Sequence, residues 1–271
     1  MNIVITGAGG VLCSAFSRAL AADGHKIALL DLNLEAAERE AEDIRKAGGE
    51  AIAVQANVLD KESLKKAHDV VLEKFGPCEV LINGAGGNNP KGTTTSEYFN
   101  KEDMLDENAR SFFDLDRDGV SFVFNLNFLG TLLTTQAFAT DMLETGGCIV
   151  NISSMNAFTP LTKIPAYSGA KAAVSNFTQW LAVHFANCNI RVNAIAPGFF
   201  ATNQNRTLLF NEDGSLTPRS HKIISQTPMG RFGEPEELLG TLRFLIDNDA
   251  SGFVTGITIP VDGGFSAYSG V

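Results

Sequence analysis

Short apolar runs alternate with helical stretches along most of the chain, and this alternation constrains the fold more than any other feature. Short apolar runs bounded by polar or glycine residues are typical of buried strands, and the segments between them carry apolar residues at helical spacing. This order predicts an α/β fold with a parallel sheet. The predicted strands are 3–5, 26–30, 51–56, 80–82, 148–152, 190–196 and 257–261, and the predicted helices are 11–22, 34–47, 61–75, 120–143, one that opens at Tyr167 and one that starts near 234.

Composition excludes several classes of protein. The 271 residues are 44% hydrophobic, which is typical of a globular chain, and the unbroken alternation favours one domain over residues 1–271. A net charge of −10 argues against nucleic-acid binding, and no basic cluster or long apolar run indicates a membrane partner. The first residues lack the basic start of a signal peptide. The four cysteines and four histidines are scattered, so we expect free thiols in a reducing compartment, no metal site and a cytoplasmic protein.

A glycine turn after the first strand predicts a dinucleotide site. Such a turn lets backbone N–H groups and the start of the next helix approach a pyrophosphate. Asp31 ends the second strand, 24 positions after the first of these glycines, where a carboxylate can bind a ribose hydroxyl pair and repel a 2′-phosphate. NAD is therefore favoured over NADP. The turn and helix start consist of Gly7, Gly9, Gly10, Val11 and Leu12.

Two further strand ends are candidate cofactor contacts. Asn57 and Val58 follow the third strand, where an adenine could lie. Asn83, Gly84 and Ala85 follow the fourth, and glycine there permits the close backbone approach that a ligand at the edge of a parallel sheet requires. An ordinary glycine turn is the alternative for this second group.

Two long polar segments interrupt the alternation, near 88–119 and 203–228. Loops of this length in a compact α/β domain are usually functional or disordered, and we interpret both as substrate lids. Between them, Asn127 interrupts the apolar stripe of the helix predicted over 120–143. A buried asparagine needs hydrogen-bond partners, so Asn127 either braces the helix or holds a water behind a catalytic lysine.

Tyr167 and Lys171 carry the candidate chemistry. They are four positions apart and therefore share one face of a helix. An ammonium group beside a phenol favours its ionised form, which suits the tyrosine to moving a proton. Ser153 and Ser154 end the preceding strand, so a serine hydroxyl there could bind a substrate oxygen. A packing tyrosine and a solvated lysine are the alternative for this pair taken alone.

Together these residues resemble the short-chain dehydrogenase/reductase family over the full length. The resemblance implies a single doubly wound Rossmann-type domain with a seven-stranded parallel sheet flanked by helices. It implies that Tyr167 is the acid/base, that Ser154, 13 residues earlier, holds the reacting oxygen, and that Lys171 lowers the tyrosine pKa and binds the nicotinamide ribose. Asn127 would anchor a proton-relay water. Pro197, Gly198 and Thr202 would contact the nicotinamide. One departure is that Val11 and Cys13 occupy positions where the family usually has glycine, so Gly9 and Gly10 would have to form the turn.

Several stretches resemble one branch of this family more closely, the D-mannonate oxidoreductases, which interconvert D-mannonate and D-fructuronate. They include 83–88, 112–116, 153–158, 193–200 and 263–271. The resemblance implies a sugar-acid substrate and an assembly of four or two subunits. We expect Asn156 to bind substrate hydroxyls and Arg206 to bind the carboxylate, with Lys91 and Lys163 as other cation candidates. The alternatives are a dehydrogenase for another sugar acid or polyol, and a non-catalytic NAD-sensing protein.

Overall fold

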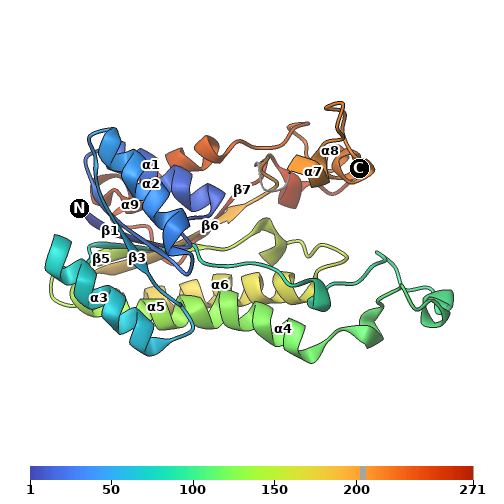
Figure 1. Cartoon of the computed structure of the whole chain (residues 1–271), viewed down its shortest axis with the longest axis horizontal. Helices are drawn as coiled ribbons and strands as arrows, with labels where there is room; N and C mark the ends of the chain where they lie inside the picture. The colour runs from blue at the N-terminus through green and yellow to red at the C-terminus, as the bar shows by residue number, and fades with distance from the viewer. Residues whose placement is uncertain (202–205, 271) are drawn as a thin grey trace.

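A parallel sheet forms the centre of the molecule. The computed structural model describes residues 1–201 and 206–270, and within these ranges seven strands pair in the order β3-β2-β1-β4-β5-β6-β7 (Figure 1). The predicted α/β, doubly wound fold class is therefore confirmed. The strands are β1 (Asn2–Thr6), β2 (Lys26–Asp31), β3 (Glu50–Gln55), β4 (Val80–Asn83), β5 (Gly147–Ile152), β6 (Ile190–Pro197) and β7 (Thr258–Val261).

Helices cover both faces of the sheet, so both faces of its strands are buried. In Figure 1, α1, α2 and α9 lie above the sheet and α3, α5 and α6 lie below it. Ile3 and Ile5 pack into the upper layer of the core, and Val4 between them packs into the lower layer. This explains why the strands read as continuous apolar runs without alternation. The helices are α1 (Val11–Ala22), α2 (Leu34–Lys46), α3 (Lys61–Phe75), α4 (Arg117–Phe124), α5 (Gly130–Phe138), α6 (Pro165–His184), α7 (Arg206–Leu209), α8 (Pro218–Ser225), α9 (Leu239–Ile246) and α10 (Asn248–Ser251).

Strand order reverses between β1 and β4, which pair in parallel although two other strands separate them in the sequence. The connections on the two sides of this point run to opposite faces of the sheet, which leaves a crevice at the carboxyl ends of the central strands. The turns after β1, β4 and β5 all end at this edge. The topology therefore brings the glycine turns and the serine pair together.

The single helix predicted over 120–143 is wrong in two respects. The helix begins earlier, because Asp116 caps the first turn of α4 by accepting a hydrogen bond from the Gly119 N–H. It is also interrupted by a π-helical turn, Asn125–Leu129, before α5 begins, and its last turn, Ala139–Met142, is a 3₁₀ helix. The side chain of Asn127 donates to the carbonyl of Val123 inside this turn, which helps to explain why the regular ladder is broken.

The two segments interpreted as lids lie beyond the carboxyl edge of the sheet. We call 88–119 the first lid segment and the described part of the other, 206–228, the second lid segment. The first carries three short 3₁₀ turns and extends away from the sheet, whereas the second carries α7 and α8 on the other side (Figure 1). The Thr94 N–H donates to the Lys163 carbonyl, which ties the first lid segment to the loop after β5. Opening and closing of either segment stays a prediction.

The C-terminal segment is partly covered by its own chain. The Phe265 ring packs edge-to-face on Phe199 at 5.4 Å between centroids, although the sequence suggested that Phe265 lacks a cover within the chain. Phe253 is fully exposed and Tyr268 is half exposed. The expected burial of this segment in a second subunit stays a prediction. No helix in the described residues is both long and apolar enough to cross a membrane.

Candidate active site

Ser154, Tyr167 and Lys171 meet at the carboxyl end of β5. Ser154 follows the strand and caps a short 3₁₀ turn, where its hydroxyl accepts from the Asn156 N–H at 3.3 Å. Tyr167 lies in the first turn of α6 and shares a hydrogen bond with Ser154. Ser153 is held elsewhere, because its hydroxyl lies 2.7 Å from the Ser175 hydroxyl and donates to the Lys171 carbonyl. Of the two serines, Ser154 is therefore the one beside the tyrosine.

Lys171 is buried one turn after Tyr167. Its Nζ donates to the carbonyl oxygen of Ile152 at 2.7 Å and lies 5.7 Å from the centre of the Tyr167 ring. Burial lowers the pKa of Lys171 from 10.5 to about 8, because the charged ammonium loses its water, and the nearby Cys13 opposes this only in part. The amine is therefore poised between its two protonation states near neutral pH.

The expected depression of the tyrosine pKa is not produced by these side chains alone. Burial raises the pKa of Tyr167 above its ordinary value of 10, and the opposing influence is the hydrogen bond with Ser154. Lys171 gives its proton to a backbone carbonyl instead of the phenol oxygen. In this structure Tyr167 is thus a neutral phenol at physiological pH, ready to donate a proton.

Replacing Lys171 with methionine is expected to stabilise the cofactor-free protein at pH 7. A base whose pKa falls on folding binds fewer protons when folded, so the folded state is penalised below pH 8 and the penalty disappears as pH rises from about 8 to 10.5. At 1.36 kcal/mol per pKa unit, minus about 1 kcal/mol for the lost bond to Ile152, the net gain is about 2 kcal/mol. Urea unfolding of both proteins at pH 7 and pH 10 measures it. A variant less stable than wild type at pH 7, or an equal difference at both pH values, contradicts the expectation.

Asn127 braces the edge of the site. It is 1% exposed, its amide donates to the Gly87 carbonyl at 2.7 Å, and its Oδ1 accepts from the Gly87 N–H at 3.2 Å. A Cβ at Gly86 would lie 2.6 Å from Asn127 Oδ1 and 3.1 Å from Lys171 Nζ. Asn127 therefore joins the π-turn to the loop after β4 and lies behind Lys171, as one reading of the sequence required. Its part in a proton relay stays a prediction.

Gly86 is a site residue that the sequence analysis did not single out. Its lack of a side chain keeps Asn127 and Lys171 close together. The signal was available, because Gly84, Gly86 and Gly87 form a run after β4, but a run alone does not say which glycine faces the lysine.

The two glycine turns pack directly against each other at the strand reversal. Gly7 has a φ of +65°, and a Cβ there would lie 2.9 Å from the Ala85 backbone. The Thr6 hydroxyl accepts from the N–H groups of Gly84 and Ala85 at 3.2 Å each. Both contacts bring backbone, and no bulky side chain, to the floor of the crevice. A pyrophosphate needs such a surface.

The start of α1 is free to bind an anion. Gly10 caps the helix without a side-chain hydrogen bond, and no acidic residue lies in the first turn, so the N–H groups of Val11 and Leu12 face no competing anion there. Cys13 is buried and points toward Gly84, where a Cβ would lie 2.2 Å from its sulfur. Gly84 therefore makes room for the cysteine that stands at a usual glycine position.

Asp31 is already fixed by the backbone around it. Its Oδ2 accepts from the Gly9 N–H and its Oδ1 from the Asn33 N–H, both at 2.9 Å. A Cβ at Gly9 would lie 2.7 Å from the Ala36 side chain, so glycine is required there. The carboxylate thus stands beside the glycine turn at the end of β2, where the sequence predicted it.

The remaining predicted cofactor residues lie along the same edge of the sheet. Asn57 follows β3 and its Oδ1 accepts from the Leu59 N–H, while Val58 is buried against Gly130. Pro197 ends β6, and the Gly198 N–H donates to the Val261 carbonyl. A Cβ at Gly198 would lie 2.6 Å from Asp262. Asn83 is buried beneath the turn, where its amide donates to Asn151 and Thr135. Thr202 lies outside the described residues.

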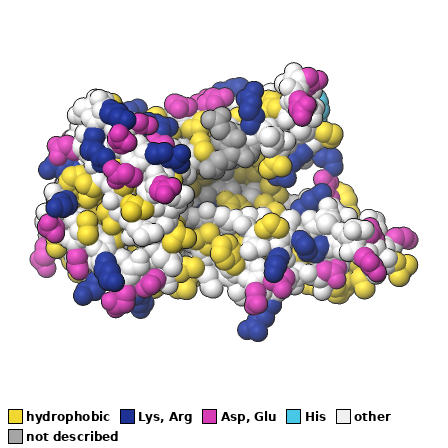
Figure 2. All heavy atoms as spheres, in the orientation of Figure 1, with side chains coloured by type: hydrophobic (Ala, Val, Ile, Leu, Met, Phe, Trp, Pro, Cys, Tyr) yellow, Lys and Arg dark blue, Asp and Glu magenta, His cyan; other side chains and the backbone are white. Residues whose placement is uncertain are grey.

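The two predicted substrate residues have different surroundings. Asn156 is buried next to Ser154, and its Oδ1 has no hydrogen-bond partner among the described residues. Arg206 is exposed at the start of α7, with its guanidinium 5.3 Å from the centre of the Phe210 ring. Figure 2 shows the surface hollowed between the second lid segment above and the layer of α4 and α6 below. The orphan oxygen of Asn156 would be satisfied by a donor such as a substrate hydroxyl.

Similarities to known proteins agree with this geometry. Residues 9–266 match the family model described as enoyl-(acyl carrier protein) reductase. A Haemophilus influenzae protein called an uncharacterized oxidoreductase is 62% identical over 270 residues, which cover 99% of this chain and 94% of that protein. The uncharacterized oxidoreductase UxuB of Bacillus subtilis is 54% identical over 269 residues, which cover 99% of this chain and 95% of that one. A Haemophilus influenzae crystal structure with bound NAD, provisionally described as a D-mannonate oxidoreductase, has a TM-score of 0.96 and 61% identity, covering 99% of this chain and 96% of that one.

Proposed function

The chain belongs to the short-chain dehydrogenase/reductase family and is an oxidoreductase acting on CH–OH groups, and from that premise we propose that it interconverts D-mannonate and D-fructuronate with NAD as its cofactor. The meeting of Ser154, Tyr167 and Lys171 at the carboxyl end of β5 carries the chemical part of the proposal. Similarity to the NAD-bound Haemophilus protein supports the cofactor and the substrate.

The residues of the crevice fit a dinucleotide. Gly7 and Ala85 leave backbone at the place where a side chain would fill the crevice, and α1 offers an uncapped N-terminus for the pyrophosphate. Asp31 would accept hydrogen bonds from the adenosine ribose, and its charge would repel the 2′-phosphate of NADP. Pro197 and Gly198 would border the nicotinamide, and Lys171 would bind its ribose. When bound, this cofactor supplies the hydride acceptor or, in reduced form, the hydride donor.

The chain's own residues manage the proton. In ketone reduction, the Tyr167 hydroxyl donates its proton to the substrate oxygen as the carbon gains hydride, and in alcohol oxidation the phenolate takes that proton back. Ser154 donates a hydrogen bond to the same oxygen and so fixes its position. Lys171, held by the Ile152 carbonyl, places a positive charge near the phenolate when the amine is protonated. Asn127 holds the loop after β4 against this group.

Turnover with a matched pair of substrates tests the function. With NADH we expect reduction of D-fructuronate and much slower reduction of the neutral ketose D-fructose. Oxidation of D-mannonate with NAD should release D-fructuronate, which chromatography against a standard identifies. Reduction of another keto sugar acid but not of D-fructuronate would refute the assigned substrate and leave the dehydrogenase chemistry. A wild-type protein that oxidises no sugar acid and no polyol, yet binds NAD, would instead be a non-catalytic sensor.

A further inference from the structure

We propose that Arg219 on α8 binds the carboxylate of the sugar-acid substrate and so determines the enzyme's preference for anions over neutral sugars. This inference rests on the proposed function and deepens it. Its grounds are the orientation of α8, the charges that surround the hollow and the lack of a partner for the Arg219 side chain among the described residues.

One side of α8 is anchored and the other is open. Ser220 and Ile223 are buried, and the Ser220 hydroxyl donates to the Leu209 carbonyl, which fixes this side against α7. Arg219 and Lys222 are both exposed and lie three positions apart, so they are neighbours on the surface of the helix. The direction in which Lys222 extends therefore indicates the direction of this edge of the helix.

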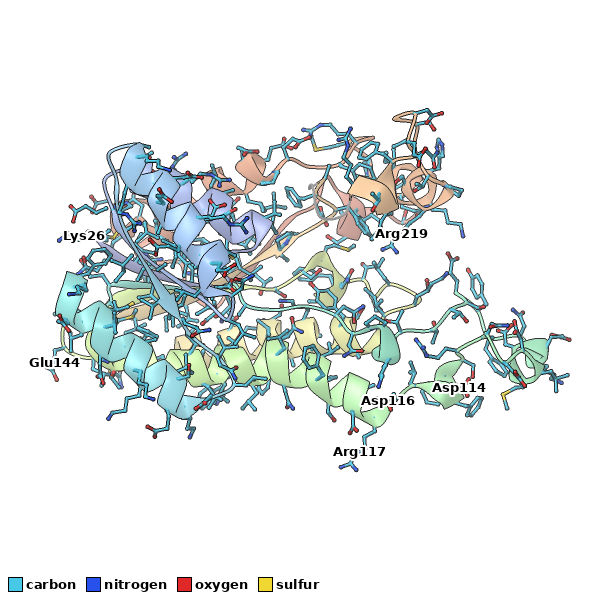
Figure 3. All side chains as sticks on the ribbon, in the orientation of Figure 1. Lys26, Asp114, Asp116, Arg117, Glu144 and Arg219 are labelled. Atoms are coloured by element: carbon cyan, nitrogen blue, oxygen red, sulfur yellow. The ribbon has the colours of Figure 1, made fainter. Side chains whose placement is uncertain are left out.

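Lys222 reaches the opposite lid segment. Its Nζ lies 2.8 Å from Glu97 Oε1, in an ion pair that joins the second lid segment to the first across 125 positions of sequence. The edge of α8 that carries Lys222 and Arg219 thus faces the space between the two segments. In Figure 3 the labelled Arg219 side chain points from α8 into this space, toward the layer of α4 and α6. Figure 2 shows Lys and Arg side chains bordering the same hollow.

The other cations of the two lid segments are already engaged. Lys222 is neutralised by Glu97, and Lys222 together with nearby Lys163 lowers the pKa of that carboxyl below its ordinary value. Arg206 lies against the Phe210 ring. Arg219 has no ion pair or hydrogen bond among the described residues, so its charge remains available. In a chain of net charge −10, a free guanidinium at this hollow is a specific provision for an anion.

The chemistry of the guanidinium suits a carboxylate. Arginine presents a planar fork of N–H donors that matches the two carboxylate oxygens, and the pair is frequently bidentate. A neutral ketose offers no such partner. Loss of the fork should therefore weaken binding of the sugar acid by about tenfold to a hundredfold, without a comparable effect on a neutral sugar or on NADH.

The test compares Arg219→Gln with the matched variant Arg206→Gln, each saturated with NADH. Calorimetry measures the binding of D-mannonate and of its neutral counterpart D-mannitol, and steady-state assays measure KM and kcat for D-fructuronate. For Arg219→Gln we expect at least about a tenfold rise in the Kd of D-mannonate and in the KM of D-fructuronate. The Kd of D-mannitol, the affinity for NADH and kcat should be nearly unchanged. Arg219→Lys should restore part of the loss.

Each contrary result has a distinct meaning. Equal weakening of D-mannonate and D-mannitol would overturn the inference, because Arg219 would then shape the lid without reading charge. A charge-selective loss in Arg206→Gln and none in Arg219→Gln would transfer the role to Arg206 and also overturn it, as would wild-type protein that binds no sugar acid. If wild type reduces no D-fructuronate yet Arg219→Gln selectively loses D-mannonate, the inference stands and only the proposed substrate fails.

Discussion

Replacing Tyr167 with phenylalanine is expected to lower kcat by about a hundredfold to ten-thousandfold, which is the usual contribution of a positioned proton carrier. The substitution removes one hydroxyl and keeps the ring that packs beside Lys171, so the crevice and its affinity for NADH should be unchanged. Stopped-flow and steady-state assays with D-fructuronate measure the rate, and fluorescence titration measures NADH binding. Tyr98→Phe is the matched control, because Tyr98 lies exposed on the first lid segment and should leave kcat unaltered.

Wild-type turnover by the Tyr167 variant would remove this residue from the mechanism. A loss of NADH binding in parallel with turnover would show that the substitution had disturbed the crevice and not the proton transfer. Neither result is expected, since the hydroxyl of Tyr167 bonds to Ser154 and to no group that shapes the glycine turns.

The two directions of the reaction should respond oppositely to pH. Reduction needs the neutral phenol, and burial raises the pKa of Tyr167, so reduction should persist through neutral pH and fall as pH rises through that raised pKa. Oxidation needs the phenolate and should accelerate over the same alkaline range. Tyr167 thus favours ketone reduction near neutrality.

The second large effect concerns cofactor choice. Asp31→Asn should raise the ratio of kcat/KM for NADPH to that for NADH by about tenfold to a hundredfold, because it removes the charge that repels the 2′-phosphate and weakens acceptance from the ribose hydroxyls. The asparagine oxygen can still accept from the Gly9 N–H, so the turn should hold. Steady-state kinetics with both cofactors at fixed substrate measure the ratio.

Asp31→Ala separates charge from structure. This variant loses the repulsive charge and also the acceptor for the N–H groups of Gly9 and Asn33, so it should use both cofactors less efficiently than Asp31→Asn and melt at a lower temperature. Equal efficiency of wild type with NADH and NADPH would contradict the assignment at once. An unchanged ratio in both variants would show that another residue selects the cofactor.

Local signals in the sequence were enough to locate most elements to within a few residues. The bounds predicted for α1 and α3 agree with the structure because glycine and aspartate near their ends mark where the periodic pattern starts and stops. Strand ends differ by a residue or two, since pairing with a neighbour decides them, as Asn83 pairs with Thr6 and Asn151. The association of Ser154, Tyr167 and Lys171 was also predictable, because all three lie within one strand–loop–helix unit.

What failed depends on contacts between distant residues. The break in the helix after Phe124 involves Asn127, whose side chain bonds to Gly87, 40 positions away. The raised pKa of Tyr167 results from burial, which no local pattern reports. The ion pair between Glu97 and Lys222 requires the relative placement of two long irregular segments, so the sequence could identify both charges but not their pairing.

The π-helical turn at Asn125–Leu129 has a consequence for sequence comparison and for protein engineering. A π-turn holds one residue more than the α-helical turn that it replaces, and one residue rotates the following helix by about 100°. Deleting any residue of the turn would therefore swing Leu133 and Phe138, both buried, off the core face, and no single replacement downstream could return them. A correct alignment with a relative whose helix is regular here needs a one-residue gap inside a helix, where alignments normally forbid gaps.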